Sequence, residues 1–215
     1  MSFEAFYEKR KNEGPRKNIT WFLNKHTEPG IAVDLGCGVG NDTIALIKSG
    51  WTVYAFDAEN TESQILEELT EEEKKRFIFK QGLIQNVEIP QCDLVVANLS
   101  LQYLKKEEFK EVMDKIYKSL NSGGYFLSVM LTNKDPWAKE KKDYAFFGSE
   151  ELNKILKGRF KSEQFLFPEP YKQPTATGEE KEWHTVILEA KCINKNLINT
   201  KRKRDEEERW VTKSK

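Results

Sequence analysis

The residues with the clearest chemistry lie together in the stretch AVDLGCGVGND, residues 32–42. An apolar run ends at Asp34, and Gly36, Gly38 and Gly40 follow at alternate positions. Glycines in this pattern allow backbone conformations with positive φ and let a ligand lie directly against the main chain. The pattern therefore predicts a ligand-binding turn between a strand and a helix.

A second acidic residue, Asp57, ends the next apolar run, 21 residues beyond Gly36. Ligands of open α/β sheets bind at the carboxyl ends of the strands. A carboxylate at that edge can accept hydrogen bonds from both hydroxyls of a ribose. The two features together predict a cofactor that contains a nucleoside.

The identity of that cofactor depends on the residues after the glycines. The dinucleotide pattern G-x-G-x-x-G would place its third glycine at Asn41, and Asp42 follows. Asp34 and Asp42 would flank a pyrophosphate and repel it, whereas they suit a cation such as the amino and sulfonium groups of S-adenosylmethionine. The sequence favours that methyl donor, and a nicotinamide-dependent oxidoreductase is the enzyme alternative.

The elements that position these residues alternate along the chain between residues 31 and 190. Short β-branched or aromatic runs are separated by amphipathic stretches, which is typical of βαβ units and a parallel sheet. We expect helices after a cap at Asn41 or Asp42, around Ile65–Leu69, over Phe109–Leu120 and after a cap at Ser149. The expected strands are Ile31–Leu35, Thr52–Phe56, Phe77–Phe79, Leu94–Ala97, Tyr125–Leu131, Phe165–Phe167 and Thr185–Ala190.

The segment VDLGCGVGND, with Asp57 and the fourth-strand sequence DLVVANLSLQYL (Asp93–Leu104), resembles class I S-adenosylmethionine-dependent methyltransferases over about residues 15–192. The stretches GGYFLSVMLTNKDPW and KEWHTVILEA resemble the small, single-domain, tellurite-resistance-like subgroup. The implied fold is α/β, a Rossmann-like, seven-stranded, mostly parallel sheet with helices on both faces. The implied cofactor is S-adenosylmethionine, with S-adenosylhomocysteine as its product.

The resemblance also implies roles for individual residues. The methionine half would lie against the glycine turn, the ribose on Asp57, the adenine beside Ala58, and the methionine amino group at the backbone carbonyl of Asn98. Related enzymes commonly carry an acidic residue for the adenine after the third strand, where this chain has Leu83. The implied cofactor-binding residues are Asp34, Gly36, Cys37, Gly38, Asn41, Asp42, Asp57, Ala58, Gly82, Leu83 and Asn98.

Candidates for the acceptor side come from the later strands. Gln102 and Tyr103 follow the fourth strand, where the methyl acceptor should arrive. Trp137 and Trp183 can wall a substrate pocket or cover the edge of the sheet. His184 opens the last strand and is the best candidate for a general base, although a structural role is more common for such a residue. No residues suggest a metal site.

The chain divides into an N-terminal helical lid at residues 1–30, a methyltransferase domain at 31–192 and a charged, flexible tail at 193–215. The domain leaves no room for a separate recognition domain, so we expect a small-molecule acceptor. The tail carries eight Lys/Arg and four Asp/Glu from residue 195 onward. Its basic run is the only support for a protein- or RNA-directed enzyme, and a cofactor-binding module without turnover is the non-enzyme alternative.

Composition excludes several classes of protein. The chain has 215 residues, 38% hydrophobic, with 35 Lys/Arg balancing 35 Asp/Glu, so net charge gives no general attraction to nucleic acid. No apolar run approaches the roughly 18 residues of a membrane helix, and no secretory signal opens the chain. Cys37, Cys92 and Cys192 lie far apart, which predicts free thiols and a cytoplasmic location. A monomer and a homodimer are both open.

Overall fold

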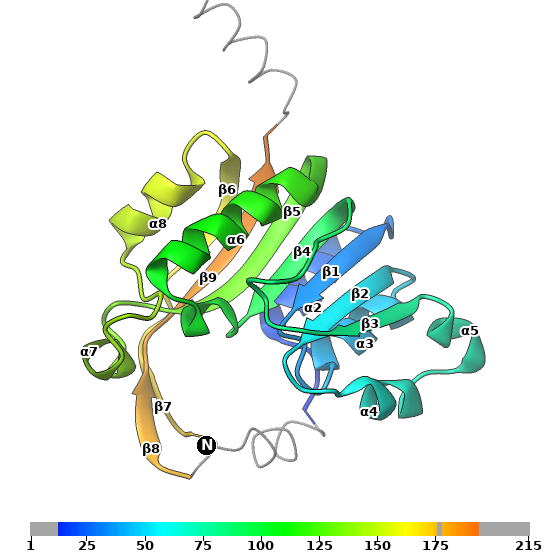
Figure 1. Cartoon of the computed structure of the whole chain (residues 1–215), viewed down its shortest axis with the longest axis horizontal. Helices are drawn as coiled ribbons and strands as arrows, with labels where there is room; N and C mark the ends of the chain where they lie inside the picture. Colours follow the sequence, from blue (N-terminus) through cyan, green and yellow to red (C-terminus); the bar gives the residue numbers. More distant parts are fainter. Residues whose placement is uncertain (1–12, 176–177, 194–215) are drawn as a thin grey trace, which may run out of the picture.

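The computed structural model describes residues 13–175 and 178–193, so the expected tail and the first part of the expected lid lie outside the described residues (Figure 1). Seven strands form one sheet in the order β3-β2-β1-β4-β5-β9-β6. The first five are parallel, and β9 runs antiparallel to both of its neighbours. The strands are β1 Ile31–Leu35, β2 Thr52–Asp57, β3 Phe77–Gln81, β4 Cys92–Asn98, β5 Leu120–Leu131, β6 Phe160–Leu166 and β9 Thr185–Cys192.

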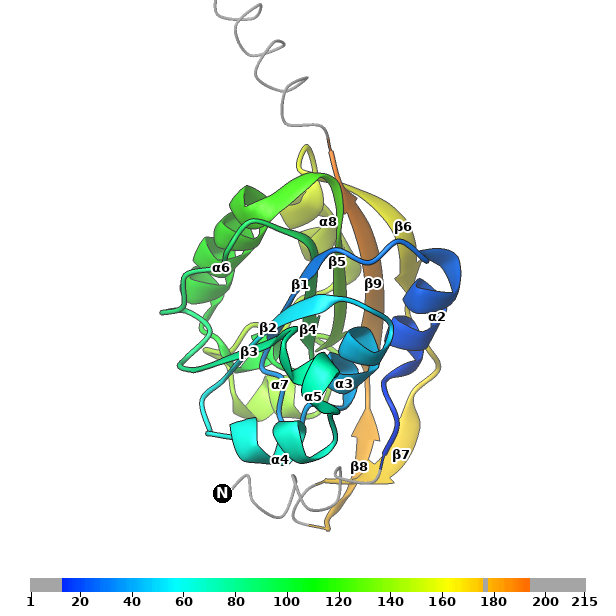
Figure 2. The same ribbon diagram turned by 90° about the vertical axis from the view of Figure 1, so that its right-hand side faces the viewer.

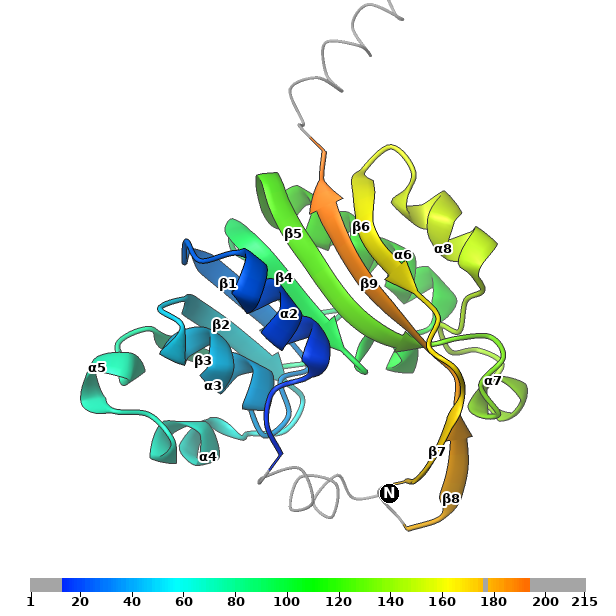
Figure 3. The same cartoon turned by 180° about the vertical axis from the view of Figure 1, so that it is seen from behind.

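Helices cover both faces of this sheet, as predicted. Figure 2 shows α6 on one side and α2 and α3 on the other, with α8 on the same side as α6 in Figures 1 and 3. The helices are α2 Lys17–Lys25, α3 Asn41–Lys48, α4 Glu62–Glu67, α5 Glu71–Lys74, α6 Lys106–Ser119, α7 Trp137–Glu140 and α8 Ser149–Leu156, with a 3-10 helix, η1, at Leu101–Tyr103.

Each face has its own apolar core, which follows from the helix patterns. Phe109, Val112 and Ile116 recur at helical spacing on α6 and are fully or almost fully buried against one face. Ile19 and Phe22 of α2 are buried in the core of the other face. Burial on both faces explains why the central strands are almost continuously apolar.

The helix boundaries differ from the prediction at two caps. The N-cap of α3 is Gly40 and not Asn41 or Asp42, and its φ of 82° is in the left-handed region that glycine adopts without strain. The N-cap of α8 is Gly148, and Ser149 is the first helical residue. In both places the chain begins the helix one residue earlier than a polar cap would require.

A two-stranded hairpin is the main element that the sequence did not predict. Strands β7, Tyr171–Pro174, and β8, Glu180–Trp183, pair only with each other in a second sheet. The expected strands include none between Phe167 and Thr185. Leu131, the last residue of β5, pairs with Thr185, the first residue of β9. The hairpin precedes Thr185 in the chain and therefore extends from the sheet at this end of β5 and β9 (Figure 3).

Helix α2 is fastened to the far side of the sheet by charge as well as by packing. Glu189 of β9, only 4% exposed, accepts a hydrogen bond from the Lys25 ammonium at 3.4 Å. The ring of His26 lies 4.4 Å from the rings of both Phe22 and Tyr125, centroid to centroid. The first helix is therefore a fixed part of the domain and can position residues at its own N-terminus.

Candidate functional site

The glycine turn is built as the sequence predicted. Gly36, Gly38 and Gly40 have φ values of 79°, 54° and 82°, all in the left-handed region. The backbone N–H groups of Gly36 and Cys37 both donate to the carbonyl of Phe56, at 2.8 and 3.0 Å. These bonds hold the bare backbone of the turn against the carboxyl end of β2.

Asp57 joins the end of β2 to the turn. Its Oδ2 accepts a hydrogen bond from the Gly38 N–H at 2.7 Å, and its Oδ1 accepts one from the Glu59 N–H at 3.0 Å. A carboxylate oxygen can accept more than one hydrogen bond. The position suits the predicted ribose contact, which stays a prediction.

Asp34 lies in the same crevice with little to offset its charge. The side chain is buried and accepts a hydrogen bond from the Thr43 hydroxyl at 2.7 Å. Burial, and then the negative charge of Asp42, raise the pKa of Asp34 to about 8 from 3.8. The hydrogen bond from Thr43 and the charge of Arg16 lower the pKa of Asp34, but by less than burial and Asp42 raise it. The ligand-free crevice therefore holds a proton where a cation would fit.

A chain of amides connects Asp42 to the first helix. Asn98, at the end of β4, donates from its side-chain amide to Oδ2 of Asp42 at 2.8 Å. The Asn18 amide donates to the Asn98 side-chain oxygen at 2.9 Å, and the Arg16 N–H donates to Oδ1 of Asp42 at 2.8 Å. The sequence prediction included Asp42 and Asn98 but not Asn18, which lies 80 residues before Asn98 in the chain. The only sequence feature that could have indicated Asn18 is an asparagine near the start of a helix.

The residues after β4 include one with an unfavourable backbone conformation and one with a buried polar atom that has no hydrogen-bond partner. Leu99 has a φ of 52°, the only left-handed non-glycine residue among those described. Gln102 is 2% exposed, and its side-chain oxygen has no hydrogen-bond partner. Desolvation raises the pKa of the neighbouring Tyr103 hydroxyl, although the residue as a whole is 43% exposed. An unpaired buried carbonyl oxygen is a feature that a ligand N–H or O–H would satisfy.

The proposed adenine side is more open. Leu83 is 51% exposed, and the Gly82 N–H already donates to the Asp57 carbonyl at 2.8 Å. The Ala58 carbonyl accepts a hydrogen bond from the Gln81 side chain at 2.8 Å.

Burial raises the pKa of the Cys37 thiol well above its usual value, which disfavours a thiolate nucleophile there.

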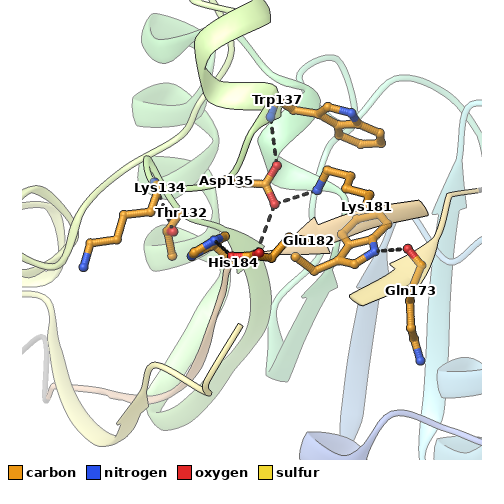
Figure 4. Close-up of polar contacts among 9 residues, drawn as sticks. Thr132, Lys134, Asp135, Trp137, Gln173, Lys181, Glu182 and His184 are labelled. Atoms are coloured by element: carbon orange, nitrogen blue, oxygen red, sulfur yellow. Dashed lines mark hydrogen bonds and ion pairs between the residues drawn. The ribbon is translucent and has the colours of Figure 1, made fainter. Parts of the chain in front are cut away.

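The two predicted pocket tryptophans do come together, but around a lysine of the same chain. Figure 4 shows Lys181 pointing to Asp135 beside Trp137. The rings of Trp137 and Trp183 meet edge to face, with centroids 5.5 Å apart. The Lys181 ammonium lies 3.7 Å from the centroid of Trp183 and 4.5 Å from that of Trp137. It is also 2.6 Å from Oδ2 of Asp135, whose carboxylate is fully buried. We call Asp135, Trp137, Lys181 and Trp183 the lysine box.

His184 is placed differently. Its Nε2 lies 2.8 Å from Oε1 of Glu182. The residue lines a cavity of about 750 Å³ together with Thr132, Lys134 and the start of α8. The described lining of this cavity includes none of the predicted cofactor residues. The role of His184 as a general base stays a prediction.

Two further searches concern the described residues only. They contain no group of three or more His, Cys, Asp or Glu side chains that could hold a metal ion. None of the helices in residues 13–175 and 178–193 is long and apolar enough to cross a membrane.

Comparison with known proteins gives one family match and several partial relatives. The family described as "Methyltransferase domain" matches residues 7–163. The carboxy-S-adenosyl-L-methionine synthase of Psychrobacter sp. (strain PRwf-1) is 31% identical over 119 residues, which cover 51% of this chain and 42% of the relative. The chain thus spans less than half the length of that curated relative.

Solved structures show the same fold at lower identity. TehB from Haemophilus influenzae matches with a TM-score of 0.65 at 20% identity, over 86% of this chain and 65% of TehB. A Burkholderia thailandensis 1,6-didemethyltoxoflavin-N1-methyltransferase, solved with bound S-adenosylhomocysteine, matches with a TM-score of 0.65 at 18% identity, over 90% and 84%. At these identities the likeness to TehB extends to the fold, and the tellurite-resistance-like subgroup is not established by it.

Proposed function

This chain belongs to the methyltransferase domain family, and we propose that it moves a methyl group from S-adenosylmethionine to a small-molecule acceptor by in-line displacement. The family match confirms the enzyme class predicted from the sequence. Structural neighbours solved with S-adenosylhomocysteine support the predicted cofactor. The acceptor and the role of each site residue are our proposals.

The observation that carries the proposal is the buried acidic crevice around the glycine turn. Asp34, Asp42 and Asp57 are 2%, 8% and 7% exposed, and burial raises the pKa of the first of them to about 8. A ligand that binds here gains most if it brings positive charge, because opposite charges attract strongly in a poorly solvated site. A pyrophosphate would bring the wrong charge.

We assign the cofactor to these residues in three parts. The methionine half lies against Asp34, Gly36, Cys37 and Gly38, with Asn41, Asp42 and the Asn98 carbonyl at its amino end. The ribose hydroxyls bind Asp57. The adenine lies by Ala58, Gly82 and Leu83, held by backbone groups in place of the missing acidic side chain.

The chain's own contribution to the reaction is alignment and exclusion of water. A bound cofactor would supply an already activated methyl group, with the sulfonium sulfur as the leaving atom. The Gln102 side-chain oxygen can accept a hydrogen bond from the acceptor and so orient it after β4, with Tyr103 beside it. An acceptor hydroxyl or amine also needs a base, and His184 is the candidate for that step.

Calorimetric titration of the wild type and of Asp57→Ala tests the proposal. We expect binding of S-adenosylmethionine and S-adenosylhomocysteine, weakened about 100-fold in the variant because two charge-assisted hydrogen bonds are lost. Glu59→Ala is the matched control, since Glu59 is an exposed acid two residues away. Carboxy-S-adenosylmethionine should bind less tightly than S-adenosylmethionine, because its additional carboxylate would face an acidic crevice.

The other outcomes are equally informative. Binding of NAD(P)H alone would replace the proposal with an oxidoreductase. Binding of no ligand would favour the non-enzyme alternative, and cofactor binding without turnover of any acceptor would favour a cofactor-binding module. Cofactor binding followed by methylation of a protein or RNA, and of no small molecule, would keep the enzyme class and change the acceptor.

A further inference from the structure

We propose that the lysine box is a binding site for an organic ammonium group, and that Lys181 fills it when no ligand is bound. On the proposed function, which this inference extends, the ligand is the methyl acceptor, and the box recognises its charged end. The acceptor class is then a small molecule that carries an ammonium group.

The composition of the box matches what a cation requires. Two indole faces offer negative quadrupoles, and the buried carboxylate of Asp135 supplies a full opposite charge. Such contacts strengthen when the cation is removed from water, and the Lys181 side chain is only 6% exposed. A quaternary or alkylated ammonium fits this environment better than a primary one, because it is less strongly hydrated.

The carboxylate is held in place without the lysine. Oδ1 of Asp135 accepts a hydrogen bond from the Trp137 N–H at 3.1 Å, and Oδ2 accepts one from the His184 N–H at 3.1 Å. Both donors are backbone groups at the ends of the elements that frame the box. Removal of Lys181 therefore leaves an oriented acceptor for another cation.

The occupant belongs to an element that is otherwise exposed. All four residues of β7 are exposed, and Lys181 is the one buried residue of β8. The indole N–H of Trp183 donates a hydrogen bond to the backbone carbonyl of Gln173, in the same hairpin, at 3.0 Å. Burial also lowers the pKa of Lys181, against the opposing effect of Asp135, which shows that desolvation disfavours the charged lysine in the box.

The box lies at the edge of the sheet where the acceptor is expected. Asp135 follows the end of β5, and β5 pairs with β4, whose last residue is Asn98. An ammonium held against a carboxylate keeps its proton and is not a nucleophile. The box would thus hold a charged group away from the attacked atom, and no methyl transfer takes place within it.

The charged neighbours of the box are also defined. The Lys141 ammonium lies 4.5 Å from the Trp137 ring centroid and disfavours a second cation. The charges of Glu140 and Lys141 shift the pKa of Lys181 in opposite directions. The cationic ligand must therefore replace Lys181 and cannot simply join it.

Titration with tetramethylammonium chloride, followed through the indole N–H signals of the ¹⁵N-labelled protein, tests this directly. Trp137→Phe and Trp183→Phe assign the two signals of the box. We expect binding to Lys181→Ala to be at least roughly tenfold tighter than to the wild type, because the wild type must first release its own lysine. Lys139→Ala removes an exposed lysine of α7 and should behave as the wild type.

The controls separate charge from shape and from general effects of salt. Sodium chloride at equal concentration and tert-butanol, a neutral molecule of similar shape, should leave both indole signals unchanged. Trp137→Leu in the Lys181→Ala background should abolish the response. Equal affinity for the wild type and Lys181→Ala, or equal response to tert-butanol, would overturn the proposal.

Two further measurements keep the result interpretable. If Lys181→Ala does not fold, Lys181→Gln replaces it, and the wild type at high tetramethylammonium should still show shifts confined to the two box signals. Absence of those shifts in every folded form would overturn the proposal. S-adenosylhomocysteine binding is measured on the same samples, so that a failed cofactor site is recognised separately from a failed box.

Discussion

Two buried acidic sites lie at the same edge of the sheet, and they differ in how their negative charge is balanced. Asp135 is fully buried and has the Lys181 ammonium 2.6 Å away. Asp34 is buried to a similar degree beside Asp42, and both effects raise its pKa. The lysine box contains its own cation, whereas on the proposed function a bound ligand would supply the cation of the crevice around Asp34. A buried acidic site with poorly balanced charge lowers the free energy of unfolding. A cationic ligand would offset this cost, which is an argument that the site binds one.

The largest expected effect sets the two aspartates against each other. Asp135→Asn should lower the free energy of unfolding by about 3 kcal/mol, because it leaves a buried ammonium without its counter-charge. Asp34→Asn should raise it at pH 8, because it removes a buried carboxylate whose charge is disfavoured by burial and by Asp42. Urea unfolding of both variants measures the difference. Destabilisation of similar size in both would contradict the distinction.

Affinity for the cofactor should show the reverse order. We expect Asp34→Asn to weaken S-adenosylmethionine binding by about 2 kcal/mol, or 30-fold, through loss of a charged hydrogen-bond partner. Asp135→Asn should change that affinity little. Calorimetry in buffers of different ionisation enthalpy adds a second signature, since at pH 7 the wild type should release up to one proton from Asp34 on binding. A binding reaction without proton release would argue that Asp34 is already ionised.

The pH dependence of stability tests the same carboxyl without a ligand. Asp34 has a pKa of about 8 in the folded chain, against an ordinary value of 3.8. Because the folded state holds the proton more tightly, its stabilising effect is full below pH 4 and is lost as pH rises through 8. The slope between these limits is at most about 1.4 kcal/mol per pH unit. Urea unfolding from pH 5 to 9 should show this decline in the wild type and not in Asp34→Asn.

The glycine turn and the strand ends around it could be predicted because their determinants are local. The strand Ile31–Leu35, the glycines after it and Asp57 at the end of the next strand each follow from short patterns, and the parallel topology brings them to one edge. The exact N-cap was missed because Gly40, with its left-handed φ, replaces a polar cap. The seven-stranded sheet followed from the same alternation of runs.

The lysine box could be predicted only in part because its determinants are distant. Trp137 and Trp183 were recognisable as large aromatic residues in loops beside the site. Nothing local marked Lys181, since it occupies one position in a charged, exposed stretch and pairs with a residue 46 positions earlier. Asn18, whose partner is 80 positions away, was missed for the same reason. Long-range polar pairs depend on tertiary packing that no local pattern encodes.

The smallest expected effect concerns the two rings of the box. A double-mutant cycle between Lys181→Met and Trp183→Leu should give a coupling free energy of about 1 kcal/mol, and the cycle with Trp137→Leu should give less. The order follows from geometry, because the ammonium is 3.7 Å from the Trp183 centroid and 4.5 Å from that of Trp137, which it shares with Lys141. Addition of Lys141→Ala should raise the Trp137 coupling toward that of Trp183. Equal couplings that do not respond to Lys141 would mean that the rings stabilise the lysine through packing alone, and that the box has no selectivity for charge.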